Sequence, residues 1–258
     1  MIKIAFSFDD GRKDTVRMFY DILKPLNIPF TINVTTGYIN KCIELSDYPS
    51  LNEPMSVDDL IKMNNESLIE ISGHGRKHNN DCDNFIDGIN DLRNILNTNS
   101  KIGLASPQCM FDLKKIPECR QLFDKNKVLY FRTGDRFYNN VFLKKGLRKI
   151  NKLLKISPIY YYVYKDSAIN YSTDNYVLYS AIVTKFDTLN NMKYFIRKAI
   201  KENKSFILMF HSILKPGEQF YNDTYSWDYD NFADFCKFLK RLEEENKIEL
   251  IKVRDFII

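Results

Sequence analysis

Histidine is scarce in this sequence, with 3 residues among 258. The five cysteines are odd in number and scattered, and none forms a Cys-x-x-Cys pair; they are Cys42, Cys82, Cys109, Cys119 and Cys236. This pattern suggests neither a disulfide framework nor a cysteine zinc site, and it favours a reducing, intracellular compartment. Any imidazole chemistry must therefore rest on three side chains.

Long hydrophobic runs and basic blocks are also missing. The longest clean apolar run is Phe206 to Phe210, far below the roughly 20 residues of a membrane span. No long apolar stretch precedes Asp9 and Asp10, so we expect no signal peptide, a mature chain that begins at Met1, and a cytoplasmic protein. Lys and Arg exceed Asp and Glu by 38 to 33, but the two signs are mixed. We see no basic cluster and no amphipathic anchor, which argues against a nucleic-acid or membrane partner.

The residues that are present describe a folded α/β protein. Hydrophobic residues make up 44% and charged residues 28%, as in ordinary globular domains. Short apolar runs alternate with helical stretches, which is typical of βα units around a parallel sheet. About seven strands are expected, at Ile2–Phe8, Phe30–Thr35, Leu68–Ser72, Ile102–Ala105, Val128–Arg132, Val177–Val183 and Phe206–His211. That number is enough to close a barrel.

Helical spacing of apolar residues fills the intervals between these strands. We expect helices over Val16–Leu23, from the capping residue Ser56 to Met63, over Phe85–Leu96 and over Phe232–Leu239, with a strand-like segment at Ile248–Val253. Neither an internal repeat nor a Gly/Ser-rich linker is present, so residues 1–258 are predicted to form one domain. Two segments depart from the alternation and are interpreted as insertions. Residues 38–54 are polar and rich in turn residues, and residues 159–176 are crowded with tyrosine, which either lines a sugar site or packs on the barrel wall.

Two adjacent carboxylates end the first predicted strand. Asp9 and Asp10 are followed by Gly11, which can turn the chain so that both side chains lie at the mouth of the sheet. Active sites of α/β barrels are built at the carboxyl ends of the strands. An isolated Asp-Asp-Gly is more often a simple turn, so this motif needs a second observation beside it.

The histidines supply that observation. His74 and His78 follow another predicted strand, four residues apart, within reach of one metal ion if the chain turns. Three scattered histidines would give such a pair by chance roughly 2% of the time. Two imidazoles and a carboxylate form a common open site for a catalytic ion, with Asp9 or Asp10 as the third ligand. His211 ends a further strand, so all three histidines are expected at one face of the barrel.

Together these motifs resemble the polysaccharide deacetylase (NodB homology) family, carbohydrate esterase family four. Its first motif, Thr-Phe-Asp-Asp-Gly, is matched by residues 7–11, its His-Ser/Thr-x-x-His motif by residues 74–78, and its late Leu-x-His-like motif by residues 208–211. The resemblance implies a distorted (β/α)7 barrel and removal of acetyl groups, usually from the nitrogen of N-acetylglucosamine units.

The resemblance also implies a role for each matched residue. Asp9 would be the general base, Asp10 a metal ligand with His74 and His78, and His211 the general acid. These roles agree with the chemistry, because an amide is a poor electrophile and its amine leaves only when protonated. Zinc is the expected ion, and a site of two histidines and one aspartate also accepts cobalt, nickel or manganese.

Two of the family's motifs are altered or missing. In the third, Pro107 is retained, but Ser106 stands where the family has arginine and Gln108 where it has an aromatic residue. The resemblance implies that the backbone amide of Gln108 serves as an oxyanion donor. Arg132 is the candidate to replace the missing arginine beside Asp9, and a surface or structural ion pair is the alternative for it. No Asp-x-x-Asp-Trp motif is found. Trp227 is the candidate ring for stacking a sugar, although a lone tryptophan before a helix is more often part of the core.

The predicted partner is therefore a carbohydrate. Two alternatives stay open beside deacetylation of an N-acetylated sugar. One is hydrolysis of another carbon–nitrogen bond, as in a deformylase or an amidase. The other is a glycan-binding relative that has lost turnover, which the altered motifs would suit.

Overall fold

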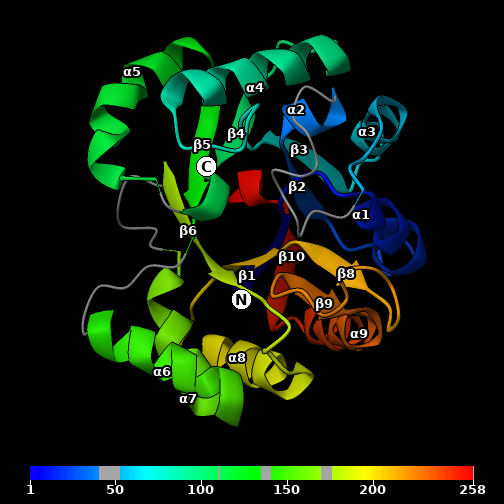
Figure 1. Ribbon diagram of the computed structural model, residues 1–258. Helices are drawn as coiled ribbons and strands as arrows, with labels where there is room; N and C mark the ends of the chain where they lie inside the picture. Colours follow the sequence, from blue (N-terminus) through cyan, green and yellow to red (C-terminus); the bar gives the residue numbers. More distant parts are fainter. Residues whose placement is uncertain (41–52, 110, 135–140, 170–175, 258) are drawn as a thin grey trace.

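A closed barrel of parallel strands forms the centre of the molecule (Figure 1). The computed structural model describes residues 1–40, 53–109, 111–134, 141–169 and 176–257. Neighbouring strands pair in chain order, and β1 also pairs with β7 from Ile4↔Phe206 to Phe8↔Phe210, which closes the ring. The seven strands are β1 (Ile2–Phe8), β2 (Phe30–Val34), β3 (Ile69–Gly73), β4 (Ile102–Ala105), β5 (Val128–Thr133), β6 (Val177–Ile182) and β7 (Phe206–Phe210). The predicted (β/α)7 barrel is confirmed, and each predicted strand lies within about a residue of its place.

Three short strands lie outside the ring of seven. β10 (Ile248–Ile251) runs parallel to the first half of β1, whereas β2 pairs only with Ser7 and Phe8 at its end. β10 thus occupies the edge of β1 that β2 leaves open. β8 (Ser212–Leu214) and β9 (Ser226–Asp228) form a separate parallel pair just after β7.

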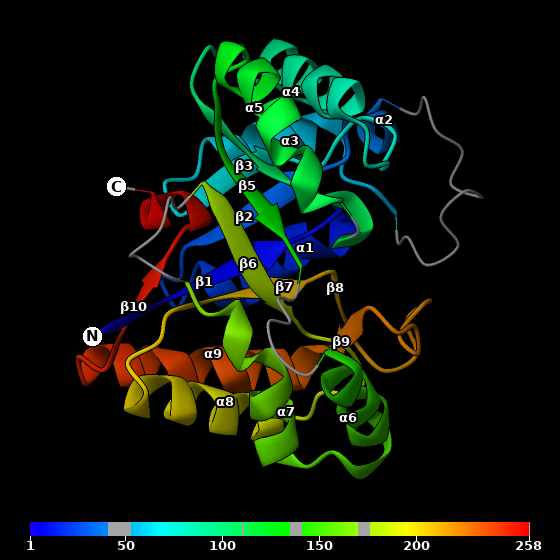
Figure 2. The ribbon, with the colours of Figure 1, turned by 90° about the vertical axis from the view of Figure 1, so that its left-hand side faces the viewer.

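Helices surround the barrel, as Figures 1 and 2 show. Their bounds are α1 (Lys13–Met18, continued by the π-helical turn η1 over Phe19–Leu23), α2 (Thr36–Ile39), α3 (Val57–Asn64), α4 (Cys82–Leu96), α5 (Ile116–Lys125), α6 (Val141–Leu154), α7 (Ser157–Tyr164), α8 (Leu189–Lys201) and α9 (Tyr229–Glu244). The described residues also form 3-10 turns at η3 (Pro107–Cys109), η4 (Leu113–Lys115), η5 (Lys165–Ser167) and η6 (Val253–Phe256). The expected capping box before α3 is confirmed, because the Ser56 hydroxyl accepts from the Asp59 amide while the Asp59 carboxylate accepts from the Ser56 amide.

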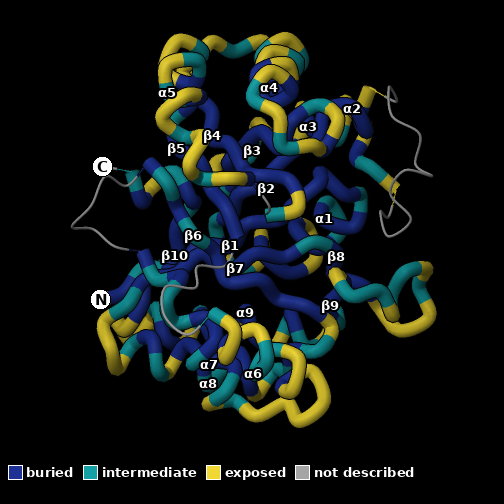
Figure 3. Tube along the Cα trace, turned by 60° about the vertical axis from the view of Figure 1, so that its left-hand side comes forward, coloured by how far each residue is buried: buried dark blue, intermediate teal, exposed yellow. Residues whose placement is uncertain are grey.

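The two faces of the strands differ in polarity. Phe8, Phe30 and Phe210 point outward. Phe8 packs on both Phe30 and Phe210, and Phe8 and Phe210 pack on Phe232 of α9, with ring centroids 5.3 to 5.9 Å apart. The alternate residues, which point inward, include several buried polar side chains: Ser7, Thr31, Asn33, Ser72, Arg132 and Ser180. Successive side chains of a strand point to opposite faces, so a single alternation separates an apolar shell from a polar interior. Figure 3, in which buried residues are dark blue, shows that these strands are buried along most of their length.

The tyrosine-rich segment belongs to the outer layer. Tyr160, Tyr161 and Tyr164 lie on or beside α7 and are almost fully buried, and Tyr160 and Tyr161 pack on Phe195 of α8. Of the two interpretations of residues 159–176, packing on the barrel wall is the one these contacts support. Residues 170–175 lie outside the described part, as do residues 41–52 of the other predicted insertion.

The cysteine interpretation is wrong for one pair. Cys82 and Cys119 form a disulfide across a Cα–Cα distance of 6.2 Å, although 37 residues separate them in the chain. Cys82 begins α4 and Cys119 lies in α5, and the two helices pack side by side (Figure 1). Packing of successive helices on a barrel brings distant cysteines together, which the spacing of cysteines alone does not reveal.

Breaking this disulfide should weaken the fold measurably. Closing a loop of this length lowers the entropy of the unfolded chain, so the Cys82→Ser, Cys119→Ser double variant should lose about 2–4 kcal/mol of unfolding free energy. Chemical denaturation would measure the loss. A Cys236→Ser variant is a control for removing a buried thiol outside the disulfide. Equal stability of the double variant and the wild type would contradict this contribution.

Among the described residues, we find no helix whose length and apolar content would let it cross a membrane.

Candidate metal centre and catalytic site

The end of β1 presents both carboxylates to the mouth of the barrel. Asp10 and Gly11 both have positive φ, at 77° and 74°, so the chain turns sharply directly after the strand. A positive φ is unusual for a residue other than glycine and indicates a conformation held by its surroundings. Asp9 and Asp10 are 2% and 1% exposed. Two buried carboxylates require partners, and their contacts divide them into different roles.

His74 and His78 face one oxygen of Asp10. The Nε2 atoms of His78 and His74 lie 3.2 and 3.5 Å from Asp10 Oδ1. The other ring nitrogen of His74, Nδ1, is 3.0 Å from the carbonyl oxygen of Ala105. A carbonyl only accepts, so Nδ1 carries the proton and Nε2 presents its lone pair toward Asp10.

These three side chains fit a divalent metal ion. Their ligand atoms lie within 4.8 Å of one another. Asp10 Oδ1 is buried and has no hydrogen-bond partner among the described residues, an arrangement that costs free energy unless something else satisfies the oxygen. Two neutral imidazoles and one carboxylate are a donor set typical of catalytic ions, with positions left for water and substrate.

Arg12 holds the other oxygen of Asp10. Its Nη2 and Nε donate to Asp10 Oδ2 at 2.7 and 3.0 Å, and its Nη1 donates to Ser212 Oγ at 2.8 Å. Burial acts to raise the pKa of Asp10, but Arg12 and the two histidines outweigh it and hold that pKa well below its usual range. Asp10 is therefore an anion whose orientation is fixed. The sequence analysis did not identify Arg12, and its position directly after Asp-Asp-Gly was the only available signal.

Asp9 has a separate set of partners. Its Oδ1 accepts hydrogen bonds from Arg132 Nη2 at 2.5 Å and Asn33 Nδ2 at 2.7 Å, while its Oδ2 lies 3.9 Å from His74 Nε2. Burial acts to raise the pKa of Asp9, but Arg132, His74 and His211 outweigh it and lower that pKa. Arg132 thus lies where the sequence analysis expected a replacement arginine. Asn33, from the interior face of β2, was not foreseen.

Ser106 and Gln108 lie at the carboxyl end of β4. The Ser106 amide donates to the carbonyl oxygen of Arg132 at 2.8 Å, so the third motif is tied to β5 through its backbone. Gln108 has a positive φ of 54° within η3. The turn therefore places Gln108 on the same end of the barrel as Asp9, although its side chain is exposed.

His211 follows β7 and reaches the same mouth. Its ring lies 4.8 Å from that of Tyr225, and its Nδ1 is buried without a hydrogen-bond partner in the described part of the chain. Burial lowers the pKa of His211 from 6.5 to about 4, and the attraction of Asp10 and Asp9 only partly opposes this effect. In the protein without a metal ion, His211 is therefore neutral at pH 7.

This lowered pKa predicts a loss of stability on acidification. Between pH 6.5 and about 4 the unfolded chain binds a proton at His211 that the folded chain does not, so stability falls as the pH falls. The full shift corresponds to up to about 3 kcal/mol. We expect a His211→Gln variant, freed of metal with a chelator, to lose less unfolding free energy than the wild type over this range. Parallel pH curves for the two proteins would contradict the assignment.

Trp227 is not at the mouth of the site. It is 3% exposed, its Nε1 donates to the carbonyl oxygen of Asp187 at 2.6 Å, and its ring packs against Phe210 and Phe235. Of the two interpretations of Trp227, these contacts support a place in the core between β9 and α9 rather than sugar stacking.

One family model matches this sequence. It is described as polysaccharide deacetylase, and it matches residues 2–144, more than half of the chain. That range contains Asp9, Asp10, His74, His78 and Arg132 but ends before His211. No curated protein matches the chain.

Solved structures resemble the fold at low sequence identity. A peptidoglycan N-acetylglucosamine deacetylase is 11% identical over 99% of this chain and 87% of its own, with a TM-score of 0.53. A de-N-acetylase from Aggregatibacter actinomycetemcomitans is 15% identical over 51% of this chain, with a TM-score of 0.40, and the BpsB deacetylase domain from Bordetella bronchiseptica is 13% identical over 52%, with a TM-score of 0.43. The chain spans 63% and 64% of the lengths of these last two.

Proposed function

Because the chain belongs to the polysaccharide deacetylase family, we propose that it is a metal-dependent hydrolase that removes acetyl groups from N-acetylated sugars. The proposal takes residues 1–258 as one catalytic domain. The main observation in its support is that the two adjacent carboxylates, Asp9 and Asp10, have different partners. Asp10 directs an unsatisfied oxygen at two histidines, whereas Asp9 is held through its other oxygen, Oδ1, by Arg132 and Asn33.

Asp10, His74 and His78 would hold the ion. Zinc suits the two imidazoles, and cobalt, nickel or manganese would also be accepted. When bound, the ion supplies a Lewis acid that polarises an amide carbonyl and lowers the pKa of water. Arg12 keeps Asp10 ionised and oriented for this task.

Asp9 is suited to act as the general base. Both hydrogen bonds from Arg132 and Asn33 end on Oδ1, so Oδ2, which faces His74, is left to accept a proton. Its lowered pKa keeps the carboxylate ionised at neutral pH. A base must lie within reach of the proton that it removes, and Asp9 borders the same cluster of ligands.

His211 is suited to act as the general acid, and the backbone amide of Gln108 to donate to the developing oxyanion. The amine of an amide leaves only when protonated, and His211 is the remaining imidazole at the mouth of the barrel. Its low pKa leaves it neutral at pH 7 before the reaction, so it would first take a proton from the solvent as negative charge develops on the substrate. His211 would then stabilise that charge and deliver the proton to the leaving nitrogen.

A glycan-binding protein without turnover is the second candidate. It is favoured by the His211 Nδ1, for which the described residues supply no hydrogen-bond partner and hence no group that would raise the basicity of the ring. A deformylase or amidase would use the same residues on another carbon–nitrogen bond.

One experiment separates the three functions. Purified protein would be analysed for bound metal and incubated with a panel of N-acetylated sugars and their N-formyl analogues. A mass loss of about 42 Da with released acetate, dependent on the metal, supports the deacetylase. Formate release alone would indicate a deformylase, and glycan binding with no hydrolysis would indicate the non-catalytic relative. Asp9→Asn protein is the matched control for contaminating hydrolases.

A further inference from the structure

Helix α6 carries an exposed apolar surface outside the site. The side chains of Phe142, Leu143, Ile150, Leu153 and Leu154 are 93%, 53%, 47%, 83% and 59% exposed. They include the most exposed large apolar side chains of the described residues. Scattered apolar residues are normal on a protein surface, but a contiguous set on one helix indicates an interaction site.

The helix is also strongly basic. Residues 141–155 contain six cations and no acidic residue: Lys144, Lys145, Arg148, Lys149, Lys152 and Lys155. At 3.6 residues per turn, Phe142, Gly146, Ile150 and Leu153 fall on one stripe, flanked by Lys145 and Lys149. A Cβ added at Gly146 would meet no atom of the described residues within 4 Å, so none of them covers this stripe at its middle.

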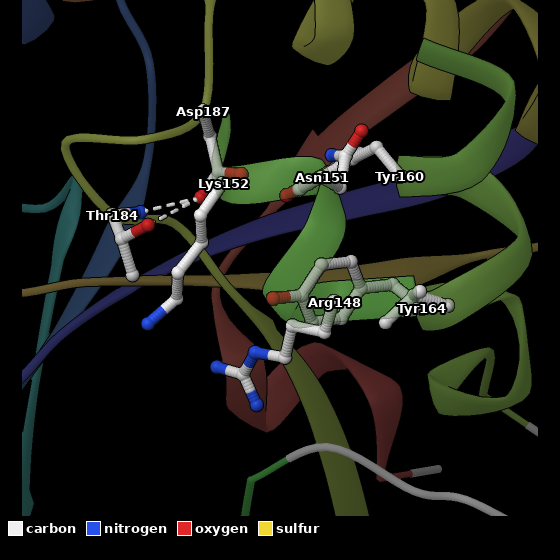
Figure 4. Close-up of a pocket in the computed structure, with 8 residues that line it drawn as sticks. Arg148, Asn151, Lys152, Tyr160, Tyr164, Thr184 and Asp187 are labelled. Atoms are coloured by element: carbon white, nitrogen blue, oxygen red, sulfur yellow. Dashed lines mark hydrogen bonds between the residues drawn. The ribbon is translucent and has the colours of Figure 1, made fainter. Parts of the chain in front are cut away.

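The opposite side fixes the helix to the protein. Lys144 and Asn151 are buried, and Lys144 forms an ion pair with Asp166. Figure 4 shows Arg148, Asn151 and Lys152 of α6 beside Tyr160 and Tyr164, with the Arg148 guanidinium 5.5 Å from the centre of the Tyr164 ring. The exposed stripe is therefore the free face of a packed helix. The prediction from the sequence that the chain has neither a basic cluster nor an amphipathic anchor is wrong at this helix.

We propose that α6 docks the protein on the surface of an anionic lipid bilayer. An amphipathic helix with lysine and arginine beside phenylalanine and leucine lies in the interface of such a membrane, its apolar face among the acyl chains and its cations among the headgroups. Both halves of the α6 surface are used in this arrangement.

Charge selects this partner over two others. A second copy docked α6 against α6 would bring two sets of cations together, with no acidic residue on either helix to oppose them. A nucleic acid would pair with the cations but would leave Phe142 and Leu153 in water. Anionic lipid satisfies both features.

The position of α6 suits a working protein on a membrane. The helix follows β5, whose carboxyl end carries Arg132, and Figure 2 shows α6 on the side toward which β5 and β6 point. Docking through α6 therefore holds the mouth of the barrel beside the bilayer. This inference does not depend on the chemistry of the site.

Flotation with lipid vesicles tests the proposal. The full chain should float with vesicles of phosphatidylcholine mixed with phosphatidylglycerol and should stay behind with phosphatidylcholine alone. Raising the salt concentration should weaken the binding, because salt screens exposed charges. Failure to bind anionic vesicles, or equal binding to both compositions, would overturn the proposal.

Two double variants test the two halves of the surface. Lys145→Glu with Lys149→Glu should reduce vesicle partitioning roughly 25-fold or more, at about fivefold for each cation lost. Phe142→Ser with Leu153→Ser should reduce it at least about tenfold.

The charge control is Lys201→Glu with Lys237→Glu, which makes the same change in net charge on α8 and α9. The apolar control is Val57→Ser with Ile61→Ser on α3, across the barrel in Figure 1. Both controls should bind like the wild type.

Other results would assign the surface to another partner. Equal losses in the α6 variants and their controls would show that location does not matter and would overturn the proposal. If vesicles do not bind, two other results would also overturn the proposal. One is a dimer in solution that Phe142→Ser with Leu153→Ser converts to a monomer. The other is RNA binding that depends on Lys145 and Lys149. The side chains are exposed, so circular dichroism should report unchanged folding, and hydrolysis of a water-soluble substrate should be unaffected. If neither the wild type nor any variant hydrolyses that substrate, the result would instead contradict the proposed function.

Discussion

An Asp10→Ala variant should lose bound metal and hydrolytic activity together. Asp10 is the one carboxylate in the cluster with His74 and His78, so its removal leaves two imidazoles and no anionic ligand. Arg12, whose guanidinium donates to Asp10 Oδ2, would also lose this carboxylate as a partner beside the site. Elemental analysis of the purified variant and an acetate-release assay would measure both losses.

An Asp9→Asn variant should keep its metal and lose turnover by about 10²- to 10⁴-fold. Asn retains an oxygen that can accept the hydrogen bonds of Arg132 and Asn33, so the side chain can stay in place. The amide group of asparagine is not basic, so it cannot take the proton that Asp9 Oδ2 would accept. Equal kcat in this variant and the wild type would show that Asp9 is not the base.

The comparison of the two aspartates needs a control for the loss of one carboxylate. Asp234→Asn on α9 removes an exposed carboxylate that lies 3.5 Å from Lys237 and far from any proposed ligand. We expect normal metal content and turnover from it. Full metal occupancy in Asp10→Ala would mean that the ligand set is wrong, whatever the activity.

The sequence predicted the elements whose signal is local. The apolar runs located all seven barrel strands, and the matched motifs identified Asp9, Asp10, His74 and His78 before any geometry was known. Local signals suffice here because active-site residues of a barrel follow the carboxyl ends of its strands. Sequence order then determines which residues meet.

Partners that depend on closure of the barrel could not be predicted in the same way. Asn33 reaches Asp9 because β2 turns this residue inward, and Arg12 reaches Asp10 and Ser212 only after β8 has been laid beside α1. For Trp227 the sequence left both sugar stacking and a core position open, and packing against Phe210 and Phe235 favours the core. In each case the contacts of the residue depend on a neighbour that is brought close only by the fold.

The basic face of α6 is a different kind of omission. Its lysines recur at helical spacing from Lys145 to Lys152, and the apolar residues between them follow the same period. An apolar stripe on a helix is normally interpreted as the side that packs on the core. Here Lys144 and Asn151 face the protein and Phe142 faces outward, which only the packed structure reveals.

Arg132→Met should destabilise the protein by about 3–5 kcal/mol, because it strands a buried carboxylate. Arg132 is fully buried on β5, where it donates to Asp9 at 2.5 Å and to Ser180 Oγ at 3.3 Å. Methionine fills much of the same space but supplies neither the charge nor the hydrogen bonds. Chemical denaturation of the metal-free proteins would measure the loss. Lys237→Met, at an exposed ion pair, should change stability by less than about 0.5 kcal/mol.

A double-variant cycle separates a stranded charge from lost packing. If the cost of Arg132→Met comes from the unpaired Asp9, then Asp9→Asn in the same chain should restore part of the stability, by about 0.5–3 kcal/mol. If the cost comes from packing alone, the two losses should add. Additive losses would therefore exclude the ion pair as the cause.

The same cycle tests whether Arg132 positions the base for catalysis. Arg132→Met should lower kcat by up to about 100-fold with little change in KM, since a small misplacement of a reacting group has an effect of this size. In the Asp9→Asn background, where no base remains to be positioned, Arg132→Met should lower kcat little further. Arg132→Lys should give an intermediate kcat, because an ammonium group can keep the charge beside Asp9 without spanning the distance to Ser180. If Arg132 only supports the fold, Arg132→Met should lower kcat equally in both backgrounds. That outcome would show that Arg132 does not position the base.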